Sequence, residues 1–298
     1  MALAILFTLL FFFHMCYHFY LSIYIPHMVK SVNRKHSYTI ALFVASFCFT
    51  LGFTLRAVSS QHGHESNSAL YTASLLFIIF GPVFVCASMY LLLTHLIDFC
   101  LPFGPMQQFL GLNPGHLSKI LILSDVFGFL FQCIGGAVMS GSPGLTNDTG
   151  TNVLLFGLTI QLASFTFFLG LLFLFGRRVH GGGENGENDE KEPMSPNGSA
   201  VPANWHHKKA FGMNPLVAEV VRSMWIAGLL MEIRSIYRLV EFATGSDGYF
   251  SQHEWTFWIF EAVTMWFVLL ALEWYHPVKL LQSRGRAWFV DKHNGLQQ

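Results

Sequence analysis

Two arginines and two glutamates stand inside the last two strongly apolar stretches of the chain. Residues 234–265 read RSIYRLVEFATGSDGYFSQHEWTFWIFEAVTM, and the four charges are Arg234, Arg238, Glu241 and Glu261. The first three lie at spacings i, i+4 and i+7, so they share one face of a helix. Guanidinium and carboxylate groups form strong charge-assisted pairs with each other, or with the charged head group of another molecule. Which of these they do depends on the elements that position them.

Those elements are predicted to be transmembrane helices. Of the 298 residues, 53% are hydrophobic and 11% are charged, whereas soluble domains have about 25% charged residues. Seven apolar runs are long enough to cross the hydrocarbon at about 1.5 Å per residue. They lie at Leu3–Ile25, Tyr38–Ala57, Leu70–Thr94, Ile120–Met139, Val153–Phe175, Leu216–Phe242 and Trp255–Tyr275. The sequence therefore predicts an all-α, polytopic membrane protein with seven transmembrane helices, and its zero net charge gives no support to a nucleic-acid partner.

Lysine and arginine are concentrated on one side of this arrangement. The loops after the first, third and fifth predicted helices and the C-terminal segment contain most of them, whereas the opposite side has Arg56 alone. The positive-inside rule then places the N-terminus outside and the C-terminus in the cytosol. We expect a membrane domain over residues 1–282, containing a disordered cytosolic loop at about 179–210, and a short cytosolic tail at 283–298.

Two glycosylation sequons bear on this orientation. Asn147 begins N-D-T in the loop predicted to lie outside, and Asn197 begins N-G-S in the loop predicted to be cytosolic. We expect only Asn147 to be available for glycosylation, because glycans are added on the outer side. A glycan on Asn197 would overturn the predicted topology.

The charges of the last two helices are predicted to lie at matching depths. If the sixth helix ends near Phe242, Arg238 lies about 6 Å and Arg234 about 12 Å below the outer boundary. Counted from Trp255, Glu261 lies about 9 Å deep in the antiparallel neighbour, between the two arginines. An unpaired charge at the bilayer centre costs about 2.5–3.5 kcal/mol, so these groups should face inward and pair between the helices. Two interpretations stay open: a salt-bridge lock, or a polar cavity that opens toward the outer leaflet.

Further polar residues lie in the other predicted helices. Gln132 and Gln161 fall near mid-membrane in neighbouring antiparallel helices and are predicted to hydrogen-bond to each other. Asp125 and Tyr90 fall at similar depths toward the cytosolic end. A lone carboxylate there needs a partner or a proton.

The first predicted helix contains His14 and His18, four residues apart in the sequence HMCYH. This spacing could ligate a metal or haem, but a complete site needs further ligands at the same depth. Because no other predicted helix has a histidine near mid-membrane, we expect packing or hydrogen-bonding histidines, with no metal and no cofactor. The five cysteines form no C-x-x-C pair and are expected to be free thiols.

Several of these residues also form a pattern of their own. The sixth helix and the following turn match R-x-x-Y-R-x-x-E, G-x-x-G-Y and H-E, at Arg234, Tyr237, Arg238, Glu241, Gly245, Gly248, Tyr249, His253 and Glu254. This pattern resembles the fungal RTA-like family, the resistance-to-aminocholesterol proteins or lipid-translocating exporters. The resemblance continues at Pro82, Ala87, Tyr90, Asp125, Gln132, Gly135, Gly136, Gly157, Gln161, His276 and Pro277. One departure lies in the second helix, where the family has E-x-x-G-Y-x-x-R and this chain has Phe49, Gly52, Phe53 and Arg56, without the acidic residue.

The resemblance implies seven helices with the N-terminus outside, in agreement with the charge distribution. It also implies a plasma-membrane exporter of lipids or toxic amphiphiles, such as sphingoid bases and sterol analogues, that confers stress or drug resistance. The expected substrate-pathway residues are Arg56, Arg234, Tyr237, Arg238, Glu241, Glu254 and Glu261. Their carboxylates could attract a cationic head group, or their guanidinium groups could receive a phosphate or carboxylate. No G-x-x-x-x-G-K-[ST] sequence is present, so ATP hydrolysis by that route is excluded.

Two other function classes remain as alternatives. The first is a seven-helix sensor or regulator of lipid asymmetry that moves no substrate itself. The second is a membrane lipid-modifying enzyme, which would need several His and Asp ligands at one depth around a metal. The histidines here are scattered, so we expect no enzymatic activity. The expected partners are membrane lipids or amphiphilic small molecules, with the oligomeric state left open.

Overall fold

The protein forms one bundle of long helices. The structure, a computed structural model, describes residues 2–24, 37–60, 68–100, 114–141, 146–184, 215–245 and 248–274. The helices are α1 (Ala2–Phe19) with the π-helical turn η1 (Tyr20–Tyr24), α3 (Ser37–Ser59), α4 (Ser68–Cys100), α5 (Pro114–Gly141), α6 (Thr146–Glu184) and α7 (Pro215–Thr244). A final rod is divided into α8 (Tyr249–Gln252), α9 (Glu254–Phe257), the π-helical turn η4 (Trp258–Val263) and α10 (Thr264–Trp274). No β-strand occurs in these ranges, so the predicted all-α fold is confirmed.

Membrane-spanning character is clear for most of these helices. Within the described ranges, 6 helices are long and apolar enough to cross a membrane, including Glu254–Trp274. The remaining long helix, α7, falls short of that criterion because charged residues are spread along its length. It nevertheless packs between α6 and α10, and the bundle buries Arg234 and Arg238, two of its charged residues.

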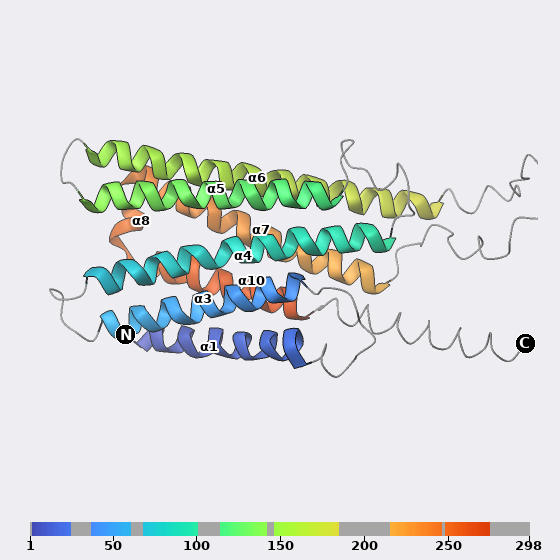
Figure 1. Cartoon of the computed structure of the whole chain (residues 1–298), viewed down its shortest axis with the longest axis horizontal. Helices are drawn as coiled ribbons and strands as arrows, with labels where there is room; N and C mark the ends of the chain where they lie inside the picture. The colour runs from blue at the N-terminus through green and yellow to red at the C-terminus, as the bar shows by residue number, and fades with distance from the viewer. Residues whose placement is uncertain are drawn as a thin grey trace, which may run out of the picture.

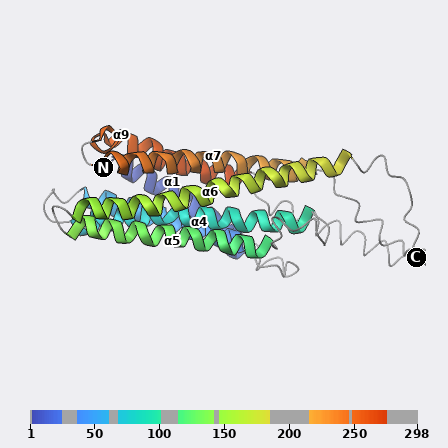
Figure 2. The same cartoon turned by 90° about the horizontal axis from the view of Figure 1, so that it is seen from above.

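The helices run roughly parallel to one long axis (Figures 1 and 2). The α5–α6 pair lies on one side and the α1–α3 pair on the other, with α4, α7 and α10 between them (Figure 1). The turn through α8 lies at the end of the bundle where α1 begins. The outward surface is apolar, with side chains such as Phe13 and Leu123 more than half exposed. Such a surface suits contact with lipid tails.

Aromatic rings fill the space between α1, α3 and the last rod. Phe11 stacks on Phe49 and Phe53, with ring centroids 4.9 and 5.3 Å apart, and all three side chains are fully buried. Phe7 stacks on Trp258 of η4 at 5.8 Å. Phe49 and Phe53 are the residues at which the second predicted helix departs from the family pattern. In this chain those positions serve apolar packing.

Glycines bring α5 and α6 into backbone contact. A Cβ at Gly135 would lie 2.6 Å from the backbone nitrogen of Leu154, and a Cβ at Gly157 would lie 2.5 Å from the carbonyl oxygen of Gly128. A Cβ at Gly136 would meet nothing within 4 Å. Of the adjacent glycine pair, Gly135 therefore permits the close approach.

α6 is longer than the apolar run that predicted it. It begins at Thr146 and ends at Glu184, so Asn147 lies in its first turn and residues 179–184 of the expected disordered loop are helical. Hydropathy marks where the hydrocarbon ends, whereas a helix can continue into the polar region beyond it. The rest of that loop, the sequon at Asn197 and the tail at 283–298 lie outside the described residues.

Candidate functional site

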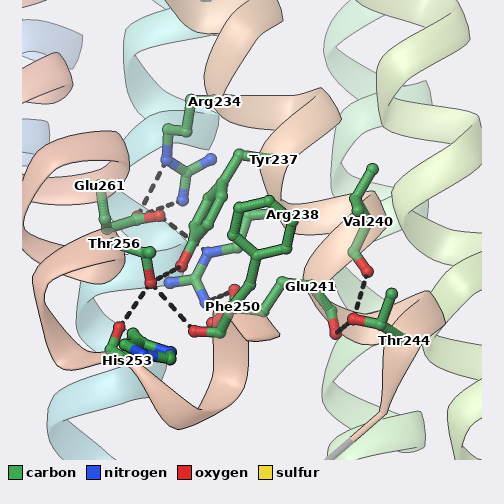
Figure 3. Close-up of polar contacts among 10 residues, drawn as sticks. All are labelled: Arg234, Tyr237, Arg238, Val240, Glu241, Thr244, Phe250, His253, Thr256 and Glu261. Carbon is green, nitrogen blue, oxygen red and sulfur yellow. Dashed lines mark hydrogen bonds and ion pairs between the residues drawn. The ribbon is translucent and has the colours of Figure 1, made fainter. Parts of the chain in front are cut away.

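One buried carboxylate bridges two arginines at the end of the bundle near α8. Arg234 Nε donates to Glu261 Oε1 at 2.9 Å, and Arg234 Nη2 contacts the same oxygen. Arg238 Nε donates to Glu261 Oε2 at 2.8 Å (Figure 3). Glu261 is 0% exposed and each arginine is 5% exposed. The predicted interhelical ion pair is confirmed, and Glu261 pairs with both arginines, as its depth between them requires.

A second carboxylate completes the charge balance. Arg238 Nη1 donates to Glu241 Oε2 at 3.0 Å, one turn along α7 (Figure 3). Two guanidinium groups and two carboxylates then sum to zero charge, which limits the penalty for burying them. The Glu241 side chain is 15% exposed, and Arg238 Nη2 is buried without a hydrogen-bond partner among the described residues. We call Arg234, Arg238, Glu241 and Glu261 the ion cluster.

A π-helical turn orients Glu261 toward α7. Glu261 lies within η4, where the helix takes one extra residue per turn. An extra residue rotates the following side chains by about 100° around the helix axis. The Thr264 hydroxyl donates to the Ile259 carbonyl at 3.0 Å, inside this widened turn. The spacing of apolar residues in the sequence does not reveal such a turn. π-Helical turns are frequent at functional sites.

The break between α8 and α9 lies beside the ion cluster (Figure 3). The Tyr237 hydroxyl donates to Thr256 Oγ1 at 3.4 Å, and the Tyr237 ring stacks on Phe260 at 4.9 Å. Thr256 Oγ1 in turn lies 2.6 Å from the His253 carbonyl and 2.9 Å from the Phe250 carbonyl (Figure 3). Tyr237, which lies between Arg234 and Arg238 in the sequence of α7, therefore connects α7 to the broken turn.

Two expected members stand apart from the ion cluster. The guanidinium of Arg56 lies 4.1 Å from the ring centroid of Phe257, a cation–π contact, and its Nη1 is buried without a hydrogen-bond partner among the described residues. The guanidinium of Arg238 lies 5.8 Å from the same ring, so Phe257 lies close to both arginines. Arg56 thus contacts an aromatic ring, and Phe49 occupies the position of the family's acidic residue. Glu254 is exposed at the start of α9, and none of its contacts in the described ranges is with the ion cluster.

The remaining predicted polar contacts lie deeper in the bundle. Tyr90 donates to Asp125 Oδ2 at 2.7 Å, and Asp125 is 1% exposed, with Cys86 beside it. Asp125 Oδ1 is buried and has no hydrogen-bond partner in the described part of the chain. Gln132 Nε2 donates to Gln161 Oε1 at 2.8 Å, as predicted. These two contacts join α4 to α5 and α5 to α6.

Two glutamates that the sequence reasoning passed over also have partners. Glu273 Oε1 lies 2.7 Å from His14 Nδ1 and 3.1 Å from His18 Nε2, which links α10 to α1. Glu232 Oε1 accepts a hydrogen bond from the Thr166 hydroxyl at 2.5 Å, which links α7 to α6. The sequence could have indicated both contacts, because Glu273 and Glu232 are carboxylates within apolar runs and such a group requires a partner.

Comparison with known proteins gives a consistent set of relatives. The family model described as RTA1 like protein matches residues 42–284. The sphingoid long-chain base transporter RSB1 of Saccharomyces cerevisiae (strain YJM789) is 28% identical over 87% of this chain and 69% of its own length. Protein RTM1 of the same species is 26% identical over 79% of this chain and 66% of its own. The probable lipid transporter atnI of Emericella nidulans is 22% identical over 86% of this chain and 62% of its own. No solved structure matches.

Proposed function

The chain belongs to the RTA1-like family, and from that premise we propose that it translocates lipids or amphiphiles across a membrane. Relatives named as a sphingoid long-chain base transporter and a probable lipid transporter support this role. We propose cationic amphiphiles such as sphingoid bases as substrates, with sterol analogues as further candidates, and increased tolerance to such compounds in the cell. Neither of these relatives is named as an enzyme, in line with a transport function.

The ion cluster is the observation that carries the proposal. It lies at one end of the bundle, where α7 meets a rod that is broken into α8, α9 and η4. Broken helices at membrane depth expose backbone and side-chain polar groups that can receive a substrate head group. A cluster buried only for packing could be replaced by apolar side chains at no loss of stability. Ionic groups retained here point to a role beyond packing.

Glu241 is the member of the ion cluster best placed to exchange partners. It is partly exposed and is held by one hydrogen bond from Arg238, whereas Glu261 is fully buried between two arginines. A substrate ammonium that binds Glu241 would release Arg238 Nη1 but leave Arg238 paired with Glu261. The cluster would then accommodate a single positive charge without leaving a guanidinium unpaired.

The test is translocation by the purified protein in liposomes. A fluorescent sphingoid base, quenched from one side, reports its movement between leaflets. We expect the wild type to accelerate this movement and Glu241→Gln to reduce the rate at least tenfold. Glu219→Gln on α7, a carboxylate outside the ion cluster, is the matched control and should behave as the wild type. If the wild type moves no probe yet its gene still raises tolerance in cells, the regulator of lipid asymmetry replaces the transporter.

We also propose a plasma-membrane location with the N-terminus outside and the C-terminus in the cytosol. The ion cluster would then face the outer leaflet, because α1 begins at the same end of the bundle as α8. Epitope tags at the two termini, detected on intact and permeabilised cells, test this orientation. A glycan at Asn147 agrees with it, and an accessible C-terminal tag on intact cells contradicts it.

A further inference from the structure

A second group of ionisable side chains lies toward the other end of the last rod. Glu273 follows Glu261 by 12 residues, which places it about 18 Å further along the helix. Its Oε1 lies 2.7 Å from His14 Nδ1 and 3.1 Å from His18 Nε2. His14 is 6% exposed, His18 is 0% exposed and the Glu273 side chain is 13% exposed. We call these three residues the histidine–glutamate triad.

The geometry of the triad does not suit a metal ion. Zinc bonds of about 2.0–2.1 Å in a tetrahedron separate neighbouring ligand atoms by about 3.4 Å. The 2.7 Å separation between His14 Nδ1 and Glu273 Oε1 is that of a hydrogen bond. Across the described ranges, no group of three His, Cys, Asp or Glu side chains could hold a metal ion. The ligand that matches this spacing is a proton.

The arrangement of the triad leaves a place for an additional proton. One carboxylate oxygen faces two ring nitrogens, and Nδ1, the other nitrogen of the buried His18 ring, has no hydrogen-bond partner in the described part of the chain. A buried polar group without a hydrogen bond costs about 1–3 kcal/mol, whereas a protonated ring gains an ion pair with Glu273. Imidazole is the side chain that ordinarily exchanges a proton between about pH 5 and about pH 8.

The surroundings of the triad add few other titratable groups. Among the described residues, Tyr17 on α1 is the other such group beside Glu273, and its ring lies 5.9 Å from that of His18. The remaining ring neighbours of His14 are Phe11 and Trp266, which do not titrate. Adding one proton to the triad raises its net charge by one, and among the described residues His14 and His18 are the cationic partners of Glu273.

We propose that His14, His18 and Glu273 form a proton-binding site whose occupancy is coupled to substrate movement at the ion cluster. This inference rests on the proposed transport function. Glu261 and Glu273 belong to one continuous rod, and α1 contacts that rod near both, through the Phe7–Trp258 stack and through His14. A change in the α1–α10 contact can thus shift η4, where a π-helical turn already interrupts the regular helix.

The chemistry of the exchange supports a proton as the coupling ion. An ammonium head group and a proton carry the same charge, so their exchange across the membrane is electroneutral. The sequence has no G-x-x-x-x-G-K-[ST] loop for ATP hydrolysis, so movement would be downhill, gradient-coupled or dependent on a partner, and the triad favours coupling to a proton gradient. For one proton exchanged per substrate, each pH unit across the membrane is worth about a tenfold ratio of substrate between the two sides.

The experiment uses the full chain in liposomes and a fluorescent N-trimethyl sphingoid base. Its permanent charge prevents the probe from crossing as a neutral amine, and protein-free liposomes measure leakage. With a gradient of about one pH unit, we expect the wild type to shift the leaflet distribution up to about tenfold in the direction set by the gradient. Glu273→Gln and the double variant His14→Gln/His18→Gln should still move the probe at equal pH but lose the shift. His95→Gln, whose ring bonds the Leu91 carbonyl of its own helix, is the matched control and should retain it.

The outcomes separate this inference from the proposed function. A wild type that moves the probe equally under all gradients overturns proton coupling and leaves transport intact. A wild type that moves no probe removes both transport and coupling. Proton binding is then decided by infrared difference spectra of the protein in membranes between about pH 5.5 and about pH 8, where imidazole titrates. Bands of carboxyl or imidazole that vanish in the variants support the site, and unchanged bands refute it. If Glu273→Gln does not fold, the single histidine variants provide the same comparison.

Discussion

Replacing Glu261 by Gln isolates what the ion cluster contributes to stability. In the wild type, Arg234 and Arg238 face two carboxylates, and the more deeply buried one is Glu261. The substitution leaves Arg234 without its ion-pair partner and Arg238 with Glu241 alone. Removing one partner of a buried ion pair costs about 3–5 kcal/mol, because an uncompensated charge stays buried. Glu241→Gln breaks one bond to a partly exposed carboxylate and should cost about 1 kcal/mol.

The measurement is reversible unfolding of the purified protein in mixed micelles of increasing denaturing-detergent fraction, followed by circular dichroism. Glu261→Asp keeps the charge on a shorter side chain and should fall between the wild type and Glu261→Gln. The double variant Arg234→Gln/Glu261→Gln restores neutrality and should recover part of the loss. If Glu261→Gln lies within about 1 kcal/mol of the wild type and equals Glu241→Gln, the reasoning about the buried ion pair is wrong.

Three further changes test other contacts in the bundle. Gly135→Val should separate α5 from α6 and lower the denaturing-detergent fraction at the unfolding midpoint. Gly136→Val should leave that midpoint unchanged, and equal effects of the two variants would refute the assigned backbone contact. Tyr90→Phe removes the donor to the buried Asp125 and should cost about 1–3 kcal/mol of unfolding free energy; adding Asp125→Asn should relieve part of the loss, and no loss in Tyr90→Phe would contradict the bond. Gln132→Leu leaves Gln161 on α6 without its amide partner and should lower the unfolding free energy by about 0.6–1.7 kcal/mol in the same assay. An unchanged unfolding free energy would contradict this hydrogen bond.

The relative heights of the predicted polar pairs followed from the sequence alone. Apolar runs predicted where the long helices lie, and a rise of about 1.5 Å per residue predicted the height of each residue along its helix. That was enough to predict that Glu261 lies between Arg234 and Arg238, and that Gln132 meets Gln161. Both pairs lie on helices that follow each other along the chain, so a short turn makes them antiparallel neighbours.

Lateral neighbours between distant helices needed the tertiary structure. Arg56 meets the ring of Phe257, and Glu273 meets His14 from the other end of the chain, because α1, α3 and the last rod pack together. The rotation of Glu261 by the π-helical turn η4 was equally hidden. Height depends on local helix geometry along one chain segment. Which faces meet depends on the simultaneous packing of all the helices, which no single segment encodes.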